Sequence, residues 1–236
     1  MYYVLKGCSS LENEITLQIR KDEIGFWDSF EALMKSYDEA NAQQSFKLLR
    51  ENKVYVTPTL HIGNILSNLK TTAHKDDKYL MYIDSSLVKT YEGRIKRALN
   101  ATEENYKMRK NLQQKFMLLT KALQQANISM LAGSDCGAFN SYIYPGISLH
   151  DELAAMVKAG LTPLEALRTS TFNGATFLRK DSFYGTIEIQ KAADLLLLDE
   201  NPLEVIRNTQ KIHILIYKGE VYDRNQLQQL KKVTKN

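Results

Sequence analysis

Three short segments place polar side chains where they could do chemistry. They are Glu12-Asn13, Thr57 to His61, and Ser134-Asp135-Cys136. Each follows a run that could form a strand, and functional groups in parallel α/β proteins collect at the carboxyl ends of strands. The third segment is the most specific, because Gly133 and Gly137 flank the aspartate and let a ligand approach the backbone. Such a carboxylate can bind a divalent cation and take a proton from its bound water.

The same turn also has a simpler interpretation. Turn aspartates often cap the backbone that follows them, and Gly-Ser-Asp-Cys-Gly alone favours that role. The functional interpretation requires that residues 128–132 form a buried strand, which would desolvate Asp135 on one side. It also requires support from the sequence downstream of the turn.

The spacing of apolar residues predicts the elements that position these segments. Residues 54–60 and 128–132 are typical of short strands, the first interrupted by Pro58. Helices of ten or more residues between short strands indicate parallel βα units. From Gly185 the chain is rich in β-forming residues up to a terminal helix of about a dozen residues. Helical spacing covers 24–36, 38–52, 102–127, 148–160 and 172–179, and a capping box with proline at N1 starts a further helix at Thr162.

Composition excludes some classes of protein. The chain has 236 residues, 44% hydrophobic and 25% charged, with a formal net charge of +4. This charge is too small to indicate a nucleic-acid partner, and no run reaches the roughly 18 apolar residues of a membrane span. The first fourteen residues lack the features of a signal peptide. Cys8 and Cys136 have no metal-binding spacing and are expected to be reduced thiols, which leaves the compartment open.

A series of motifs follows Asp135 in a defined order. The chain carries GSD at 133–135, PGISLHDEL at 145–153, AGLTPLEAL at 159–167, GTIE at 185–188 and ADLLLLDENPL at 193–203. From Leu131 to Leu203 this order resembles the closing part of the amidohydrolase superfamily. The branch it resembles contains imidazolonepropionase-like and Xaa-Pro-dipeptidase-like enzymes. Weaker similarity places KGCSSLEN and VYVTPTL at the sixth and seventh barrel strands of that family.

The resemblance implies a (β/α)8 barrel that binds one or two metals, usually zinc. It also implies a small β-sandwich built from residues before and after the barrel. Asp135 falls on the aspartate of the last strand, which binds metal and serves as general base for the attacking water. That water would attack a carbonyl carbon, and Asp135 would pass the proton to the leaving nitrogen. His61 falls just past the seventh strand, where it could contact substrate, with a solvated loop histidine as the alternative.

The histidines depart from the pattern of the family. The chain has four, His61, His74, His150 and His213, and none forms a His-x-His pair. His150 matches a position that is a packing residue in the family. We expect His213 to be structural in a strand of the sandwich and His74 to be solvated in a charged loop.

Two further departures concern single positions. Asn13 stands where the resemblance places a histidine that binds the second metal, and a neutral amide is a poor zinc ligand. The site therefore holds one metal, has lost its metal chemistry, or is misaligned at this position. In the tail, Ile189 and Gln190 replace a Pro-Gly turn of the family, which affects only the local turn geometry.

The sequence thus predicts an α/β protein with two parts. Residues 1–182 form the C-terminal part of a (β/α)8 TIM-type barrel, and residues 183–236 form the return strands of a small β-sandwich with a terminal helix. Three strands cannot close a barrel, so an N-terminal half or an oligomer partner must supply the rest.

The predicted function is metal-dependent hydrolysis of an amide or other C–N bond in a small-molecule or peptide-like substrate. Asp135 is the catalytic and metal-binding residue, and His61 is the substrate-binding residue. Zinc or another divalent metal would bind if the missing ligands are supplied, and the isolated chain is expected to be inactive. The alternative is a non-catalytic remnant that acts as a binding or scaffold module.

Overall fold

The computed structural model describes the chain except residues 2–3, 5–7, 9–25, 138–139 and 234–236. The predictions for Glu12 and Asn13 therefore lie outside the described residues. The helices of the main body are α3 (Phe26–Lys35), α4 (Glu39–Glu51), α5 (Leu60–Asn68), α6 (Ser85–Leu99), α7 (Glu103–Gln125), α8 (Ile147–Ala159), α9 (Pro163–Ser170) and α10 (Phe172–Phe177). The remaining elements are β1 (Leu195–Leu198), β2 (Ile212–Tyr217), β3 (Glu220–Tyr222) and α11 (Arg224–Val233), with short 3₁₀ turns at Leu80–Tyr82 and Ile206–Gln210.

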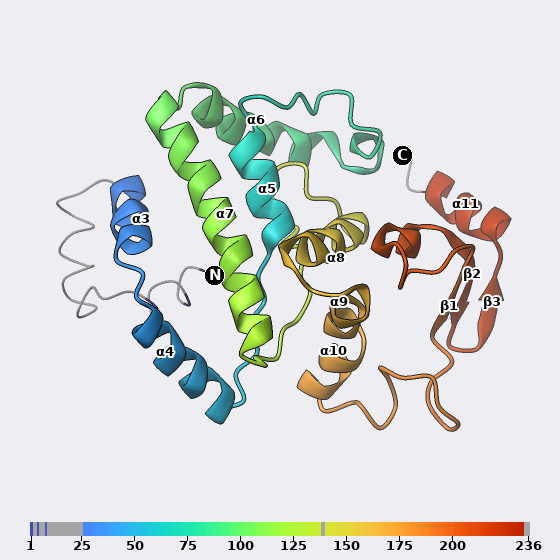
Figure 1. Cartoon of the computed structure of the whole chain (residues 1–236). Helices are drawn as coiled ribbons and strands as arrows, with labels where there is room; N and C mark the ends of the chain where they lie inside the picture. The colour runs from blue at the N-terminus through green and yellow to red at the C-terminus, as the bar shows by residue number, and fades with distance from the viewer. Residues whose placement is uncertain (2–3, 5–7, 9–25, 138–139, 234–236) are drawn as a thin grey trace.

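Helix α7 is the longest element and lies in the middle of the helical body (Figure 1). It starts where the sequence predicts, because the side chain of Thr102 accepts a hydrogen bond from the backbone N–H of Asn105. Its buried face carries Leu112, Leu119 and Leu123, and it packs against α3, α5 and α8. This helix therefore joins the N-terminal helices to the part of the chain that carries Asp135.

One continuous apolar core stabilises the helical body. Among its most deeply buried side chains are Leu33 of α3, Phe46 of α4, Leu123 of α7 and Met156 of α8. These residues come from segments more than a hundred residues apart in the sequence. Burial of a side chain of this size contributes about 1.5–3 kcal/mol to folding, so the cluster fixes the positions of the helices relative to one another.

The two strands predicted at 54–60 and 128–132 meet, but only over one residue pair. Val56 and Met130 form an isolated parallel bridge, in which the N–H of Val56 donates to Ser129 O and the N–H of Leu131 donates to Val56 O, both at 3.0 Å. The parallel direction is the one expected of neighbouring βα units. The predicted lengths were wrong, because Pro58 has no N–H to donate and α5 already begins at Leu60.

The C-terminal sheet is antiparallel and has the order β1-β2-β3. The turn between β2 and β3 lies at Lys218-Gly219, and β2 pairs with both neighbours. In β1, Leu196 and Leu197 are 51% and 54% exposed, and this strand pairs on one side only among the described residues. The sheet lies at the far side of the body from α3 and α4 (Figure 1).

The segment before β1 differs from the strand expected there. Residues 185–190 form turns and bends, and the side chains of Ile187 and Ile189 are 86% and 95% exposed. Gln190 has φ +72°, a left-handed conformation that glycine adopts without strain. A left-handed conformation is thus present at this position without a glycine.

Within the described ranges, none of the helices is both long and apolar enough to cross a bilayer.

Candidate functional site

Asp135 lies in an irregular segment that follows the parallel bridge on the carboxyl side of Met130, and we call this segment the Asp135 turn. The turn begins close to the neighbouring strand position, since a Cβ added to Gly133 would lie 2.7 Å from Cγ2 of Thr57. Asp135 itself has φ +54°, a conformation that aspartate tolerates better than most residues. A glycine before the turn and an aspartate in it are therefore residue types that this backbone accommodates.

The side chain of Asp135 is exposed, which corrects the expectation that a buried strand desolvates it on one side. The strand ends after one bridge, and the described residues do not cover the carboxylate. An exposed carboxylate is accessible to a cation or to substrate, but it gains no enhanced electrostatic interaction from burial. Any such enhancement at this position requires further protein around it.

The Asp135 turn is held by a short chain of hydrogen bonds. Asn140 Nδ2 donates to the carbonyl oxygen of Asp135 at 2.5 Å, and Arg94 Nη1 donates to Asn140 Oδ1 at 2.9 Å. Burial and the neighbouring charge of Arg97 lower the pKa of Arg94, and the negative charge of Asp135 opposes this shift. Sequence reasoning missed Arg94, because α6 has the composition of a charged surface helix and is distant in sequence from Asp135.

The described residues do not form a metal site by themselves. They contain no group of three or more histidine, cysteine, aspartate or glutamate side chains placed to hold one ion. Cys136, next to Asp135, is exposed, and the predicted departure at Asn13 lies outside the described residues. Divalent metals in proteins are held by several ligands at once, so Asp135 fits the role of one ligand and not of a complete site. No step through a metal follows from this part of the chain.

His61 lies in the first turn of α5 and is not a solvated loop histidine, since its side chain is only 13% exposed. Burial is the largest cause lowering its pKa, Asp151 opposes this shift, and the charges of Arg207 and His74 add to it. Its Nε2 lies 4.0 Å from Oδ2 of Asp151. A cavity of about 250 Å³ opens beside it, lined by His61, Ile65, Asp77, Lys78, Tyr79, Tyr142, Tyr144 and Asp151. Asp135 is not among these lining residues.

His74 was predicted to be solvated, and this was wrong. Its side chain is 9% exposed, and its ring stacks on that of Tyr142 with centroids 4.4 Å apart. Its Nδ1 lies 3.0 Å from Oδ2 of Asp77, and the hydroxyl of Tyr144 donates to the same oxygen at 2.9 Å. The partner tyrosines come from the loop after Asp135, about seventy residues away. Local composition therefore contained no signal for this burial.

Glu152 was a motif residue to which the sequence assigned no role. It is fully buried in α8, and it accepts hydrogen bonds from the backbone N–H groups of Leu60 at 2.9 Å and His61 at 2.6 Å. It thus caps the N-terminus of α5 from another helix, next to the favourable end of the helix dipole. Burial raises its pKa, and the backbone hydrogen bonds partly oppose this effect. One signal was present, because Ser148, Glu152 and Met156 share one buried helical face.

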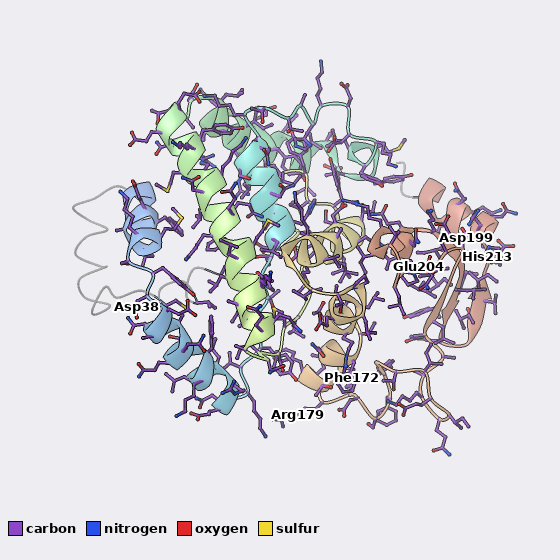
Figure 2. The ribbon with its side chains drawn as sticks, viewed as in Figure 1. Asp38, Phe172, Arg179, Asp199, Glu204 and His213 are labelled. Atoms are coloured by element: carbon purple, nitrogen blue, oxygen red, sulfur yellow. The ribbon has the colours of Figure 1, made fainter. Side chains whose placement is uncertain are left out.

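The other two histidines make contacts within the C-terminal half. His150 Nδ1 lies 2.9 Å from the hydroxyl of Thr209, and burial lowers its pKa. His213 lies in β2, and its Nδ1 is 2.9 Å from Oδ1 of Asp199, the residue labelled beside it in Figure 2. Both side chains connect neighbouring elements of the C-terminal half.

The sequence matches the model of a known protein family, described as the amidohydrolase family, over residues 9–222. The chain belongs to the amidohydrolase family. A comparison with curated proteins gave no match. The family is generally metal-dependent and is built on a TIM barrel. The parallel bridge that precedes Asp135 agrees with the parallel strands of such a barrel.

Solved structures of amidohydrolases are similar in fold. Bottromycin amidohydrolase aligns with a TM-score of 0.65 at 19% identity, over 88% of this chain and 43% of its own. A Xaa-Pro dipeptidase with bound methionine aligns with a TM-score of 0.55 at 19% identity, over 88% of this chain and 47% of its own. A putative prolidase from Bifidobacterium longum aligns with a TM-score of 0.53 at 22% identity, over 78% of this chain and 40% of its own. This chain therefore spans less than half the length of each of these relatives.

Proposed function

We propose that this chain contributes Asp135 to the site of a metal-dependent hydrolase that cleaves an amide or another C–N bond. The observation that carries the proposal is the position of Asp135. It follows the parallel bridge between Val56 and Met130, on the carboxyl side of Met130, and lies within a segment that matches the amidohydrolase family. Catalytic groups of TIM-barrel enzymes lie at this end of the strands.

The chemistry proposed for Asp135 is that of a metal ligand and general base. Its exposed carboxylate can accept the proton of an attacking water and return it to the leaving nitrogen. The hydrogen bond from Asn140 to its carbonyl oxygen fixes the turn, so the carboxylate is presented from a defined backbone position. Zinc or another divalent metal would polarise the water once other ligands are supplied.

We propose His61 as a residue that contacts a small-molecule or peptide-like substrate. It lines the cavity of about 250 Å³ with Asp151 and two tyrosines of the loop after Asp135. This loop, which includes Tyr142 and Tyr144, connects the Asp135 turn to α8. A substrate in the cavity would thus contact the chain segment that directly follows the proposed base.

The proposal includes a requirement for more protein than the described residues provide. Asp135 is exposed and the described residues lack a metal-binding group, so an N-terminal half or an oligomer partner would supply the remaining ligands. The edge of β1 agrees with this requirement, since it has no partner strand on one side among the described residues and an added strand would pair with it. The division into a barrel part, 1–182, and a sandwich part, 183–236, remains a prediction.

The test compares the 236-residue chain alone with the chain mixed with the N-terminal half of an amidohydrolase of this branch. Metal content and hydrolysis of dipeptides and N-acyl amino acids are measured for both samples. We expect metal and activity only in the mixture, both lost in Asp135→Asn and kept in Asp181→Asn, which removes another exposed carboxylate. Equal activity in the two variants would remove Asp135 from the mechanism.

The alternative is a non-catalytic binding or scaffold module. The absence of a metal-binding group from the described residues favours it. Metal analysis of the chain mixed with the N-terminal half separates the two proposals. Zinc bound in a one-to-one ratio, and lost in Asp135→Ala, would rule out the scaffold function.

A further inference from the structure

A second cavity lies between α3, α5, α6 and α7, and we call it the arginine cavity. Its volume is about 430 Å³, within the range of ligand sites in proteins. Three guanidinium groups line it, those of Arg94 and Arg97 from α6 and Arg109 from α7. Figure 1 shows α5 beside α7, with α6 near the upper ends of both. The arginines therefore line the cavity from two helices, α6 and α7.

The described residues of the cavity wall carry positive charge and no negative charge. None of the described residues that line it is an aspartate or a glutamate. Neither Arg94 nor Arg97 takes part in the ion pairs found among the described residues, and the carboxylate that acts on Arg94 is that of Asp135. Burial and then the charge of Arg97 lower the pKa of both Arg94 and Arg109. A bound anion would relieve this repulsion.

The rest of the wall is largely apolar. Leu69 is 5% exposed and Leu112 is 7% exposed, and Leu66 and Phe116 are half-buried. Gln113 is a neutral wall residue whose Nε2 donates to Leu60 O at 2.9 Å, which holds its side chain against α5. A ligand suited to this space therefore combines one anionic group with an apolar body.

We propose that the arginine cavity binds a small organic carboxylate with an apolar body. The planar guanidinium group presents two parallel N–H donors to a carboxylate, and Arg97 is exposed at the cavity where an incoming anion can reach it. Leu66, Leu112 and Phe116 would cover the apolar body. The proposal does not depend on hydrolysis by this chain.

The position of the cavity connects it to the Asp135 turn. Arg94 lines the cavity and also donates to Asn140, whose side chain donates to the carbonyl oxygen of Asp135. A carboxylate that competes for Arg94 would weaken its hold on Asn140. Ligand binding would therefore affect the Asp135 turn through two hydrogen bonds, from Arg94 to Asn140 and from Asn140 to Asp135.

The first experiment uses three probes on the full 236-residue chain, measured by titration calorimetry. They are 4-phenylbutyrate, its neutral amide, and inorganic phosphate, which has charge but no apolar body. We expect 4-phenylbutyrate to bind at least about tenfold more tightly than the amide, since a charged hydrogen bond is stronger than a neutral one. We expect phosphate to bind more weakly than 4-phenylbutyrate. Equal affinity for acid and amide, or for acid and phosphate, would overturn the proposal.

The second experiment locates the site with two matched variants. Arg97→Gln is expected to weaken 4-phenylbutyrate binding about tenfold. Arg179→Gln removes an exposed arginine beyond α10, labelled in Figure 2, and is expected to bind like the original chain. Circular dichroism checks that both variants fold. An unchanged affinity in Arg97→Gln would overturn the assignment.

A third measurement needs no variant, in case Arg97→Gln does not fold. The Nε–H signals of the arginines are followed by NMR as 4-phenylbutyrate is added to the original chain. We expect the Nε–H signals of Arg94, Arg97 and Arg109 to shift and that of Arg179 to stay unchanged. The reverse pattern would rule out this cavity as the binding site. N-acetyl-alanyl-phenylalanine is the parallel probe. If N-acetyl-alanyl-phenylalanine binds more tightly than 4-phenylbutyrate, the ligand is the carboxylate end of a peptide. If it binds more weakly, the ligand is a simple organic acid. If neither probe binds, the proposal is overturned.

Discussion

Two carboxylates mark two different regions of this molecule. Glu152 is fully buried between α8 and the start of α5, and it accepts two backbone hydrogen bonds shorter than 3 Å. Asp135 is exposed in a turn, and the hydrogen bond from Asn140 uses its backbone carbonyl and leaves the carboxylate available. The two residues are only seventeen positions apart in the chain.

The difference teaches how the same chemical group serves stability in one place and chemistry in another. Glu152 is surrounded by partners within the chain, so its removal affects folding. The carboxylate of Asp135 makes no hydrogen bond among the described residues and interacts only through its charge with Arg94, so its removal is expected to affect mainly what binds there. A site residue of an incomplete site is expected to contribute little to the stability of the part that carries it.

The largest expected effect is that of Glu152→Ala. Its loss leaves the N–H groups of Leu60 and His61 without their acceptor and opens a cavity in α8. We expect the free energy of unfolding to fall by about 2–4 kcal/mol, measured by urea denaturation. Glu92→Ala, at an exposed position of α6, is the control and should stay within about 0.5 kcal/mol. A similar small change in Glu152→Ala would break the comparison.

The pH dependence of stability gives the next effect. The pKa of Glu152 is raised in the folded chain above its ordinary value of 4.5, so the folded state holds the proton more firmly than the unfolded state. The stability from this proton is complete below the ordinary pKa and is lost as pH rises through the folded pKa. We therefore expect the stability of the original chain, relative to Glu152→Gln, to decrease from acid to neutral pH. An increase over this range, in unfolding titrations at several pH values, would show that the pKa of Glu152 is lowered by folding.

Glu165 provides an intermediate case, a half-buried carboxylate that caps a helix and also accepts a hydrogen bond from Gln124 Nε2 at 2.6 Å. It accepts from the backbone N–H of Thr162 at 2.7 Å and completes the capping box of α9. We expect Glu165→Ala to lower the free energy of unfolding by about 0.5–1 kcal/mol, because the cap is lost at a position that is only partly buried. Glu165→Gln, which can still accept, should recover most of this loss. A loss as large as that of Glu152→Ala would show that burial is not the deciding factor.

The smallest expected change in stability is that of Asp135→Asn, within about 0.5 kcal/mol. Asparagine adopts positive φ as readily as aspartate, and the hydrogen bond from Asn140 goes to the backbone. Asp135→Val should cost more, about 1–2 kcal/mol, since a β-branched residue is strained at this φ. Thermal unfolding of the two variants measures the difference. If Asp135→Asn is the more damaging of the two, the carboxylate has a structural role after all.

Part of this molecule could be predicted from the sequence because the deciding interactions are local. The capping box at Thr162 was found where the sequence predicts it, and the helices predicted at 102–127 and 148–160 were found as α7 and α8. Their ends depend on residues within four positions of each other, Thr102 with Asn105 and Gly160 with Met156. The family was identified from motifs in a fixed order, and the comparisons confirm it.

The rest depends on contacts between distant segments. The burial of His74 depends on Tyr142, and the link from Arg94 to Asn140 joins α6 to the loop after Asp135. Neither contact leaves a local pattern in the sequence. The length of the strand at Met130 depends on neighbouring strands, so periodicity alone overestimated it. The roles of Asp135 and His61 remain predictions.

Strand β1 has a consequence for handling this protein. It is a run of four leucines with an open edge among the described residues, and its two central side chains are about half exposed. Uncharged, proline-free segments of this kind pair readily with identical segments of other molecules. Concentrated solutions of the chain are therefore expected to form β-rich aggregates that begin at β1. A lysine in place of Leu196 would be a practical first step toward a soluble sample.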